Sequence, residues 1–267
     1  MERLPHRARP RGIVSSRASG ARVEAESFAP PDDLADVIER FWIARWDLSP
    51  DAPHVTELLG DPSVHIVAER GSGRVVGVWT RRWERRLEGR GEVRAAKLRP
   101  GAVRAFFTVP AHQLTDRITP PEAVSELTRI SLESVLEPLD DREGLTLLAD
   151  RLRRLRRADL ATEVERAVSI AALLGDETIL TVDALARRAA VSKRNLQRIF
   201  REHVGAPAKL LLRRARLQQA AARIDEGNAP NLARLAADLG YHDQAHLTRD
   251  LRAMLGKTPR ALEEALR

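Results

Sequence analysis

Residues 181–207 read TVDALARRAAVSKRNLQRIFREHVGAP, and this stretch decides what the last third of the chain forms. Thr181 and Ser192 are good N-cap residues, and apolar residues recur at helical spacing after each of them. Gly205 ends the second segment, because glycine accepts the left-handed backbone at a helix C-terminus and a proline follows. The stretch therefore predicts a short helix, a tight turn and a second helix over residues 193–203.

The same pattern returns after about 50 residues. Residues 231–259 read NLARLAADLGYHDQAHLTRDLRAMLGKTP, where Asn231 caps a first helix and Gly240 makes the turn. A second helix is expected over residues 243–255, and one long helix over residues 208–225 joins the two copies. The sequence thus predicts two similar helical units on a common connecting helix.

Two helices joined by a tight turn form a helix-turn-helix, whose second helix can lie in the DNA major groove. Arg and Lys suit guanine or phosphate there, whereas Asn and Gln suit adenine. The polar residues expected on the outward faces are therefore candidates for DNA contact, although each unit alone could be an ordinary pair of amphipathic helices. These residues are Lys193, Arg194, Asn195, Gln197 and Arg198 in the first unit, and Gln244, His246, Arg249 and Arg252 in the second.

Positive charge gathers in the same region. Residues 181–267 hold 17 Lys and Arg against 9 Asp and Glu, a net charge of +8, whereas the rest of the chain carries −1. A localised excess of this kind is expected for a polyanion partner, and the alternative is a solvated basic surface. Two capped copies of the motif within the basic region favour DNA.

Residues 181–262 resemble the DNA-binding domain of AraC/XylS-type transcriptional regulators. The second unit carries the more specific match, since the family signature spans it. The matching residues are Leu185, Ala186, Ser192, Leu196, Gln197, Arg198, Ile199, Phe200 and Gly205, then Ala236, Leu239, Gly240, Tyr241, Leu247, Thr248, Arg249, Gly256, Lys257, Thr258 and Pro259.

The resemblance implies a two-motif module in which six of the candidates fall where family members touch DNA. They are Arg194, Gln197, Arg198, Gln244, His246 and Arg249. Asn195 departs from the pattern, since a Tyr is common there, and Leu251 stands where a Phe is common. The target sequence can therefore not be borrowed from a relative.

Short strands are expected before residue 120. The segments with branched and aromatic content are 41–46, 54–59, 63–69, 74–79, 82–87, 92–98 and 103–109. Several short strands between turn residues predict an antiparallel barrel or sandwich. Residues 62–67, 77–78 and 97–102 also resemble, more loosely, a cupin-like domain found ahead of such modules. That resemblance implies a small β-barrel able to hold a ligand.

Helices are expected next, over residues 122–137, 141–157 and 159–174. They form either a linker or dimerising element, or a layer packed on the barrel. The predicted fold is α+β, with an antiparallel β-barrel, a helical connector and an all-α module. The expected regions are a flexible basic arm (1–28), a barrel-like sensor domain (29–119), the connector (120–175) and the DNA-binding domain (176–267).

Other chemistry finds little support in the sequence. The absence of cysteine excludes disulfides, thiol nucleophiles and alkyl-transfer repair proteins that carry a similar module but need a reactive cysteine. No nucleophile elbow, phosphate loop or paired-histidine motif is present, so we expect no catalytic residues, cofactor or metal. His54, His65 and His112 are scattered, and Trp42, Trp46, Trp79 and Trp83 either belong to the core or line an apolar pocket.

The sequence thus predicts a sequence-specific DNA-binding transcriptional regulator controlled by a small ligand in its N-terminal domain. Two alternatives stay open, a metal-dependent cupin-like enzyme with secondary DNA binding and a barrel that serves only dimerisation. Double-stranded DNA is the expected partner, and an effector, a second copy of the chain and RNA polymerase are further candidates. The Arg-rich start lacks the apolar core of a secretory signal and no stretch is long enough to span a membrane, so we expect a cytoplasmic protein.

Overall fold

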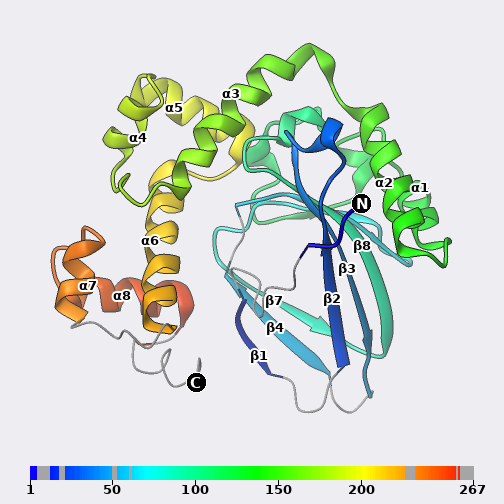
Figure 1. Cartoon of the computed structure of the whole chain (residues 1–267), viewed down its shortest axis with the longest axis horizontal. Coiled ribbons are helices and arrows are strands. Elements are labelled where there is room, and N and C mark those ends of the chain that lie inside the picture. Colours follow the sequence, from blue (N-terminus) through cyan, green and yellow to red (C-terminus); the bar gives the residue numbers. More distant parts are fainter. Residues whose placement is uncertain are drawn as a thin grey trace.

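The computed structural model describes residues 1–4, 13–17, 22–49, 53–59, 62–225, 232–256 and 258. A β-rich N-terminal part, covered on one side by helices, continues into a helical C-terminal part that extends away from it (Figure 1). Within the described residues, none of the helices has the length and apolar character needed to cross a membrane.

The strands form two antiparallel sheets. The larger has the order β2 (Arg22–Phe28), β3 (Ile38–Asp47), β8 (Arg90–Leu98), β5 (His65–Glu69), β6 (Arg74–Val76) and β9 (Ile118–Thr119). The smaller has the order β1 (Ile13–Arg17), β4 (His54–Leu59) and β7 (Arg82–Leu87). Among the described residues no strand belongs to both sheets, so the predicted barrel is not closed.

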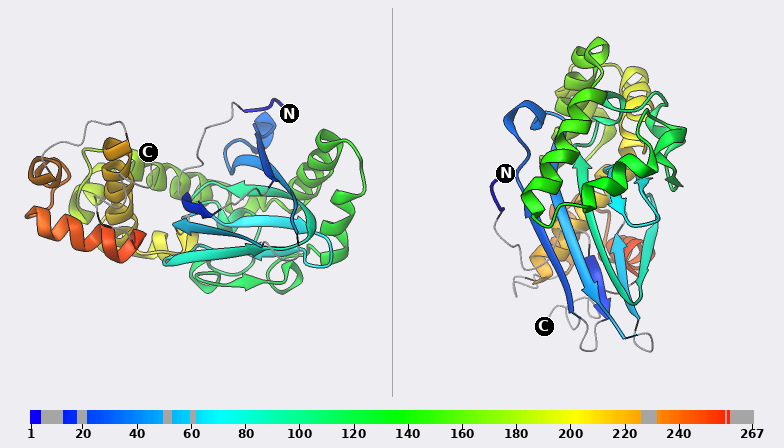
Figure 2. Two further views of the ribbon diagram at one scale, coloured as in Figure 1. Left: turned by 90° about the horizontal axis from the view of Figure 1, so that it is seen from below. Right: turned by 90° about the vertical axis from the view of Figure 1, so that its right-hand side faces the viewer.

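Side chains alternate between the two faces of the larger sheet, as strand geometry requires. Val93 and Ala95 of β8 pack in a cluster with Leu87 of the smaller sheet, whereas Ala96 and Leu98 belong to the main core. The larger sheet is therefore buried on both faces, by the smaller sheet on one and by helices on the other (Figure 2).

Two helices cover the second face, α1 (Arg129–Glu133) and α2 (Asp141–Leu155), whereas α3 (Ala161–Ala172) packs against the turns at Val103–Ala105 and Phe200–Val204. A buried charge fixes α2 to the sheet. The Arg94 side chain on β8 is 2% exposed, and its guanidinium donates to the Val135 carbonyl at 2.8 Å and to Asp141 at 3.2 Å. Asp140 caps α2 and Asp141 is its first residue, so this network holds the start of the helix against β8.

The C-terminal part contains α4 (Val182–Arg188), α5 (Lys193–Ile199), a π-helical turn η8 (Phe200–Val204), α6 (Ala208–Asp225), α7 (Leu232–Asp238) and α8 (Gln244–Leu255). The Thr181 and Ser192 hydroxyls accept hydrogen bonds from backbone N–H groups at 3.1 and 3.2 Å, as N-caps do. Asp243 caps α8 in the same way. The predicted caps of the first unit are confirmed, whereas Asn231 lies outside the described residues.

Apolar packing divides the chain differently from its secondary structure. One continuous core joins the larger sheet and helices α2 and α3 to α4, α5 and the start of α6. A separate core joins the rest of α6 to α7 and α8. The first helix-turn-helix unit thus shares its core with the N-terminal part, and the second has its own.

The predicted α+β fold is confirmed, with antiparallel strands first and two helix-turn-helix units last. The segment 103–109 is wrong as a strand, because it forms a 3-10 turn (η2, Val103–Ala105) and then loop. Its successive residues are buried without alternation (Val103, Ala105, Phe106 and Phe107). Gly101, with φ +99°, turns the chain just before them.

Two further expectations need correction. The segment 122–137 is not one helix, because Thr128 and Ser131 form a capping box that starts α1 anew. The arm 1–28 is not flexible throughout, because β2 pairs with β3 along its whole length. Because the composition before residue 23 is rich in Arg, the sequence did not predict this edge strand. Residues 5–12 and 18–21 lie outside the described part.

Candidate nucleic-acid interface

The first recognition helix, α5, has one buried and one exposed face. Leu196 and Ile199 point into the core, because apolar residues three apart share a face. The candidate residues stay outside the core: Lys193, Arg194, Gln197 and Arg198 are exposed and Asn195 is half-buried. The structure therefore keeps all five together on one accessible surface.

The second recognition helix, α8, repeats this arrangement. Leu247 and Leu251 are fully buried, and the four candidates Gln244, His246, Arg249 and Arg252 are exposed. The His246 ring stands edge-on to the Tyr241 ring, with 5.1 Å between centroids. Hydrogen bonds from the His246 backbone and from His242 hold the pKa of the capping Asp243 below its usual range. The cap is thus anionic at neutral pH, which suits a helix N-terminus.

The cations on α5 differ in how freely they can reach a ligand. The Lys193 ammonium lies 2.6 Å from an Asp183 carboxylate, and Arg198 donates to the Asn195 side-chain oxygen at 3.1 Å. The side chain of Arg194 forms no hydrogen bond or ion pair with any described residue, and the same holds for the side chain of Arg252 on α8. An exposed guanidinium without a partner can approach a base edge or phosphate without breaking an existing contact.

The connecting helix α6 holds the second unit through side chains that the sequence did not single out. Arg213 donates two hydrogen bonds of 2.7 Å to Asp250 of α8, in the bidentate geometry of strong pairs. The Arg216 guanidinium lies 4.8 Å from the centre of the Tyr241 ring. Burial, together with the nearby Asp250 carboxylate, raises the pKa of Tyr241 to about 12. These contacts fix α8 against α6.

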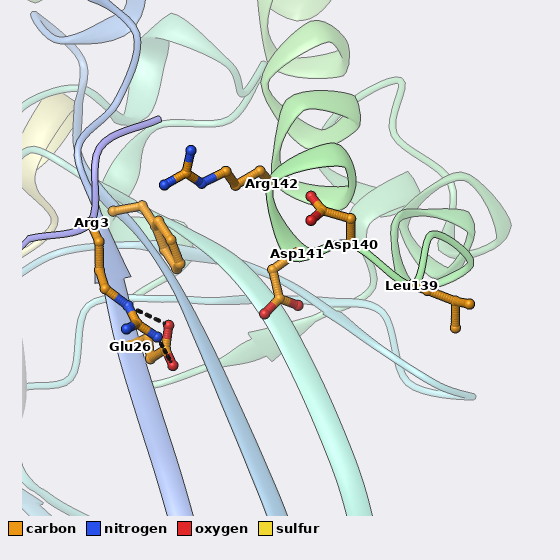
Figure 3. Close-up of a pocket in the computed structure, with 7 residues that line it drawn as sticks. Arg3, Glu26, Leu139, Asp140, Asp141 and Arg142 are labelled. Atoms are coloured by element: carbon orange, nitrogen blue, oxygen red, sulfur yellow. Dashed lines mark hydrogen bonds and ion pairs between the residues drawn. The ribbon is translucent and has the colours of Figure 1, made fainter.

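A pocket of about 360 Å³ lies elsewhere, between the first residues, β2 and the start of α2 (Figure 3). Arg3 pairs with Glu26 on one side of it, opposite Asp141, and the lining is mostly charged (Figure 3). Burial alone would raise the pKa of Asp141, but Arg45 and Arg94 hold it below its usual range. Since both guanidiniums already engage that carboxylate, this pocket offers little to a metal or catalytic water.

The structure does not gather the N-terminal histidines. His54 is buried, His65 accepts a hydrogen bond from the Trp42 indole at 3.2 Å, and His112 lies near Arg201 of η8. Within the described part of the chain, no group of three or more His, Asp or Glu side chains is placed to hold a metal ion. Trp42 and Trp46 pack between the two sheets with Trp79, which stacks on Trp83.

Two family models match the chain. Residues 26–120 match a family described as "Domain of unknown function (DUF6597)", and residues 185–265 match a helix-turn-helix domain. The second match spans both units, including the signature segment of the second. The helix-turn-helix domain and the domain that precedes it support an AraC/XylS-type transcriptional regulator. The exposed faces of α5 and α8 both lie within this helix-turn-helix domain.

Solved structures offer only distant likenesses to this regulator. ToxT from Vibrio cholerae is 7% identical, with a TM-score of 0.38 over 92% of this chain and 98% of that one. The AraC-like transcriptional activator CuxR is 16% identical, with a TM-score of 0.26 over 76% of this chain and 82% of that one. Similarity this low supports no conclusion about function. No curated protein sequence matches the chain.

Proposed function

We propose that this regulator recognises a specific promoter sequence as two short blocks in successive major grooves, one read by α5 and one by α8. The observation that carries the proposal is the pair of capped helices, each with a buried apolar face and an exposed polar face, on one connecting helix. Two such helices can enter grooves about 34 Å apart on one side of the duplex. Binding there would change transcription of nearby genes.

The side chains divide by chemistry into two roles in this proposal. Base readers have hydrogen-bonding groups suited to purine edges, and phosphate binders are cations that lie beside them. The base readers are Arg194, Gln197, Gln244, His246 and Arg249, and the phosphate binders are Lys193, Arg198 and Arg252. Asn195, which accepts a hydrogen bond from Arg198, orients that guanidinium rather than reading a base.

Control by a small ligand is the second part of the proposal, with the aromatic cluster between the two sheets as its site. Trp42, Trp46 and Trp79 pack there. The Trp79 indole nitrogen and the Nδ1 atom of His54 are buried without a hydrogen-bond partner in the described structure. Since buried polar groups normally have partners, a bound molecule could supply them. Stabilisation by a compound in a thermal-shift panel would support this site, and no stabilisation by any compound would count against it.

The alternative function, a metal-dependent enzyme, predicts a different metal content for the purified protein. A cupin-like enzyme would retain close to one metal ion per chain after purification, because its activity depends on it. Metal analysis of the purified protein should show no stoichiometric metal if the N-terminal domain serves regulation.

Selection of binders from a randomised duplex library tests the DNA proposal. The expected result is an enriched motif of two short blocks about one helical turn apart. Tight binding without enrichment, lost steeply as salt rises, would contradict it, because nonspecific binding rests on phosphate contacts.

A further inference from the structure

The N-terminal part contacts the first recognition helix at its C-terminal end. There the π-helical turn η8 (Phe200–Val204) packs against the 3-10 turn η3 (Ala111–Gln113), with η2 and α3 beside it. Figure 1 shows α5 next to the β-rich part, whereas α7 and α8 lie away from it, and Figure 2 agrees. The two units of this regulator therefore differ in their surroundings.

Two side chains of the N-terminal part reach across this junction. The Thr115 hydroxyl donates to the Gly205 carbonyl at 2.5 Å, and the His112 Nε2 atom lies 3.4 Å from an Arg201 guanidinium nitrogen. Gly205 itself allows the close approach. Its φ is +95°, and a Cβ there would lie 3.0 Å from the Ala111 carbonyl oxygen. A larger residue would therefore push the helix end away from η3.

The junction lies at one end of the face expected to meet DNA. Arg194 and Arg201 are about two helical turns apart, so they fall on nearly the same side of the recognition helix. His112 contacts this side of the helix at Arg201, whereas Lys193, Arg194 and Gln197 of the first turns remain exposed. A helix-turn-helix reads bases with the N-terminal residues of its second helix. The N-terminal part thus holds the helix without covering its reading end.

The second recognition helix has different supports. Its buried residues Leu247 and Leu251 pack in the separate core with α6 and α7, and Asp250 is held by Arg213 of α6. A change in the position of η3 would therefore reach α5 directly and α8 only indirectly.

We propose that Thr115 and His112 are positioning residues for α5, so that the N-terminal part sets the base preference of the first unit and not that of the second. The inference rests on the proposed function, because it needs a two-block target. A small displacement of a recognition helix matters, since hydrogen bonds to base edges tolerate little change in distance or angle.

The experiment uses full-length protein and the motif selected by the wild type. Arg194→Ala identifies the block read by α5, and Gln244→Ala the block read by α8. Discrimination at a block is defined as the Kd for a duplex with that block scrambled divided by the Kd for the intact duplex. It is measured for Thr115→Val, which loses only the hydroxyl, and for Thr115→Ser, which keeps it. Thr146→Val is the matched control, because the Thr146 hydroxyl donates to a carbonyl within α2.

Thr115→Val should reduce discrimination at the α5 block about 5- to 20-fold and leave the α8 block unchanged, as expected for about 1–2 kcal/mol lost from base contacts. Thr115→Ser should restore it, and Thr146→Val should match the wild type. His112→Ala should act in the same direction as Thr115→Val.

Wild-type discrimination at both blocks in Thr115→Val, or equal loss at both, would overturn the inference. Equal loss together with a lower melting temperature would show that Thr115 serves stability alone. If the wild type selects no motif at all, the proposed function itself fails, and the inference fails with it.

Discussion

Arg194 and Arg252 are exposed arginines on the two recognition helices, and neither has a partner among the described residues. The type and spacing of residues predicted that the helices expose them. Their separate roles depend on how DNA docks, which no sequence pattern records. Arg194 lies in the first turn of α5, where base contacts are made, and Arg252 lies in the last turns of α8.

Replacing these arginines should therefore have different effects. Arg194→Ala should cost about 1–3 kcal/mol of binding free energy on the selected site and relax preference at one base pair. Arg252→Ala should weaken selected and random duplexes alike and reduce the salt slope by about one. Titrations on both duplexes at several salt concentrations measure this. Equal loss on both duplexes for Arg194→Ala would refute its role as a base reader.

His203 gives the junction a pH dependence that the sequence could not show. It is 5% exposed in η8, and burial lowers its pKa despite the Glu163 carboxylate 3.9 Å away. Arg104 on η2 and Arg198 on α5 also lower the pKa, whereas Glu202 raises it. The folded state therefore keeps the imidazole neutral at a pH where the unfolded chain binds a proton.

The free energy of unfolding should accordingly fall as pH drops below about 6.5, toward the depressed pKa, with a slope of up to about 1.4 kcal/mol per pH unit from this group. His203→Gln removes the titrating group, so its stability should fall less over the same range. Denaturant titrations of both proteins between neutral and mildly acidic pH measure the difference. Identical slopes in the two proteins would show that His203 is not the source.

At the level of elements, periodicity and caps predicted α5 and α8, but not how α5 ends. The expected helix over residues 193–203 turns π-helical at Phe200, and then Gly205 adopts a left-handed conformation. The sequence predicted that Gly205 ends the helix. It did not predict the close approach of Gly205 to Ala111, because the two residues are far apart in the sequence. For the same reason the sequence did not predict the pair between Arg213 and Asp250, which joins two helices.

This pair should matter more than the other ion pairs on α6. Asp250→Asn keeps the size of an 8% exposed side chain but removes the charge that faces Arg213, so the second unit should lose about 1–2 kcal/mol. Arg223→Gln is the control, because Arg223 makes longer and more exposed contacts, 3.5 Å to Glu177 and 3.6 Å to Asp238. It should cost less than about 1 kcal/mol. Denaturant unfolding measures both, and an equal cost for the two changes would contradict this ranking.

For the whole molecule, the repeat suggested two equivalent units, and the structure makes them unequal. An apolar stripe predicts that a helix face is buried but does not say against which partner. Leu196 of the first unit shares the main core with the larger sheet, whereas Leu247 occupies the separate core. Both side chains are fully buried.

Truncating these leucines should therefore loosen different regions. Each change to Ala should cost about 2–5 kcal/mol of unfolding free energy in its own core. Leu247→Ala should speed amide hydrogen exchange in α7, α8 and the end of α6, and Leu196→Ala should speed it in α3 and η2 as well as in α5. Hydrogen exchange by mass spectrometry maps both patterns. Exchange that rises across the whole chain for both variants would argue against two separate cores.

The central claim is that α5 and α8 read two blocks at once on one side of the duplex. Inserting half a helical turn of DNA, about five base pairs, between the two blocks of the selected motif rotates one block to the opposite side of the duplex. The base pairs within both blocks stay the same. Affinity should fall close to that of a duplex with one block scrambled. Unchanged affinity after the insertion would mean that the units bind independently, and the account of one rigidly connected pair would be wrong.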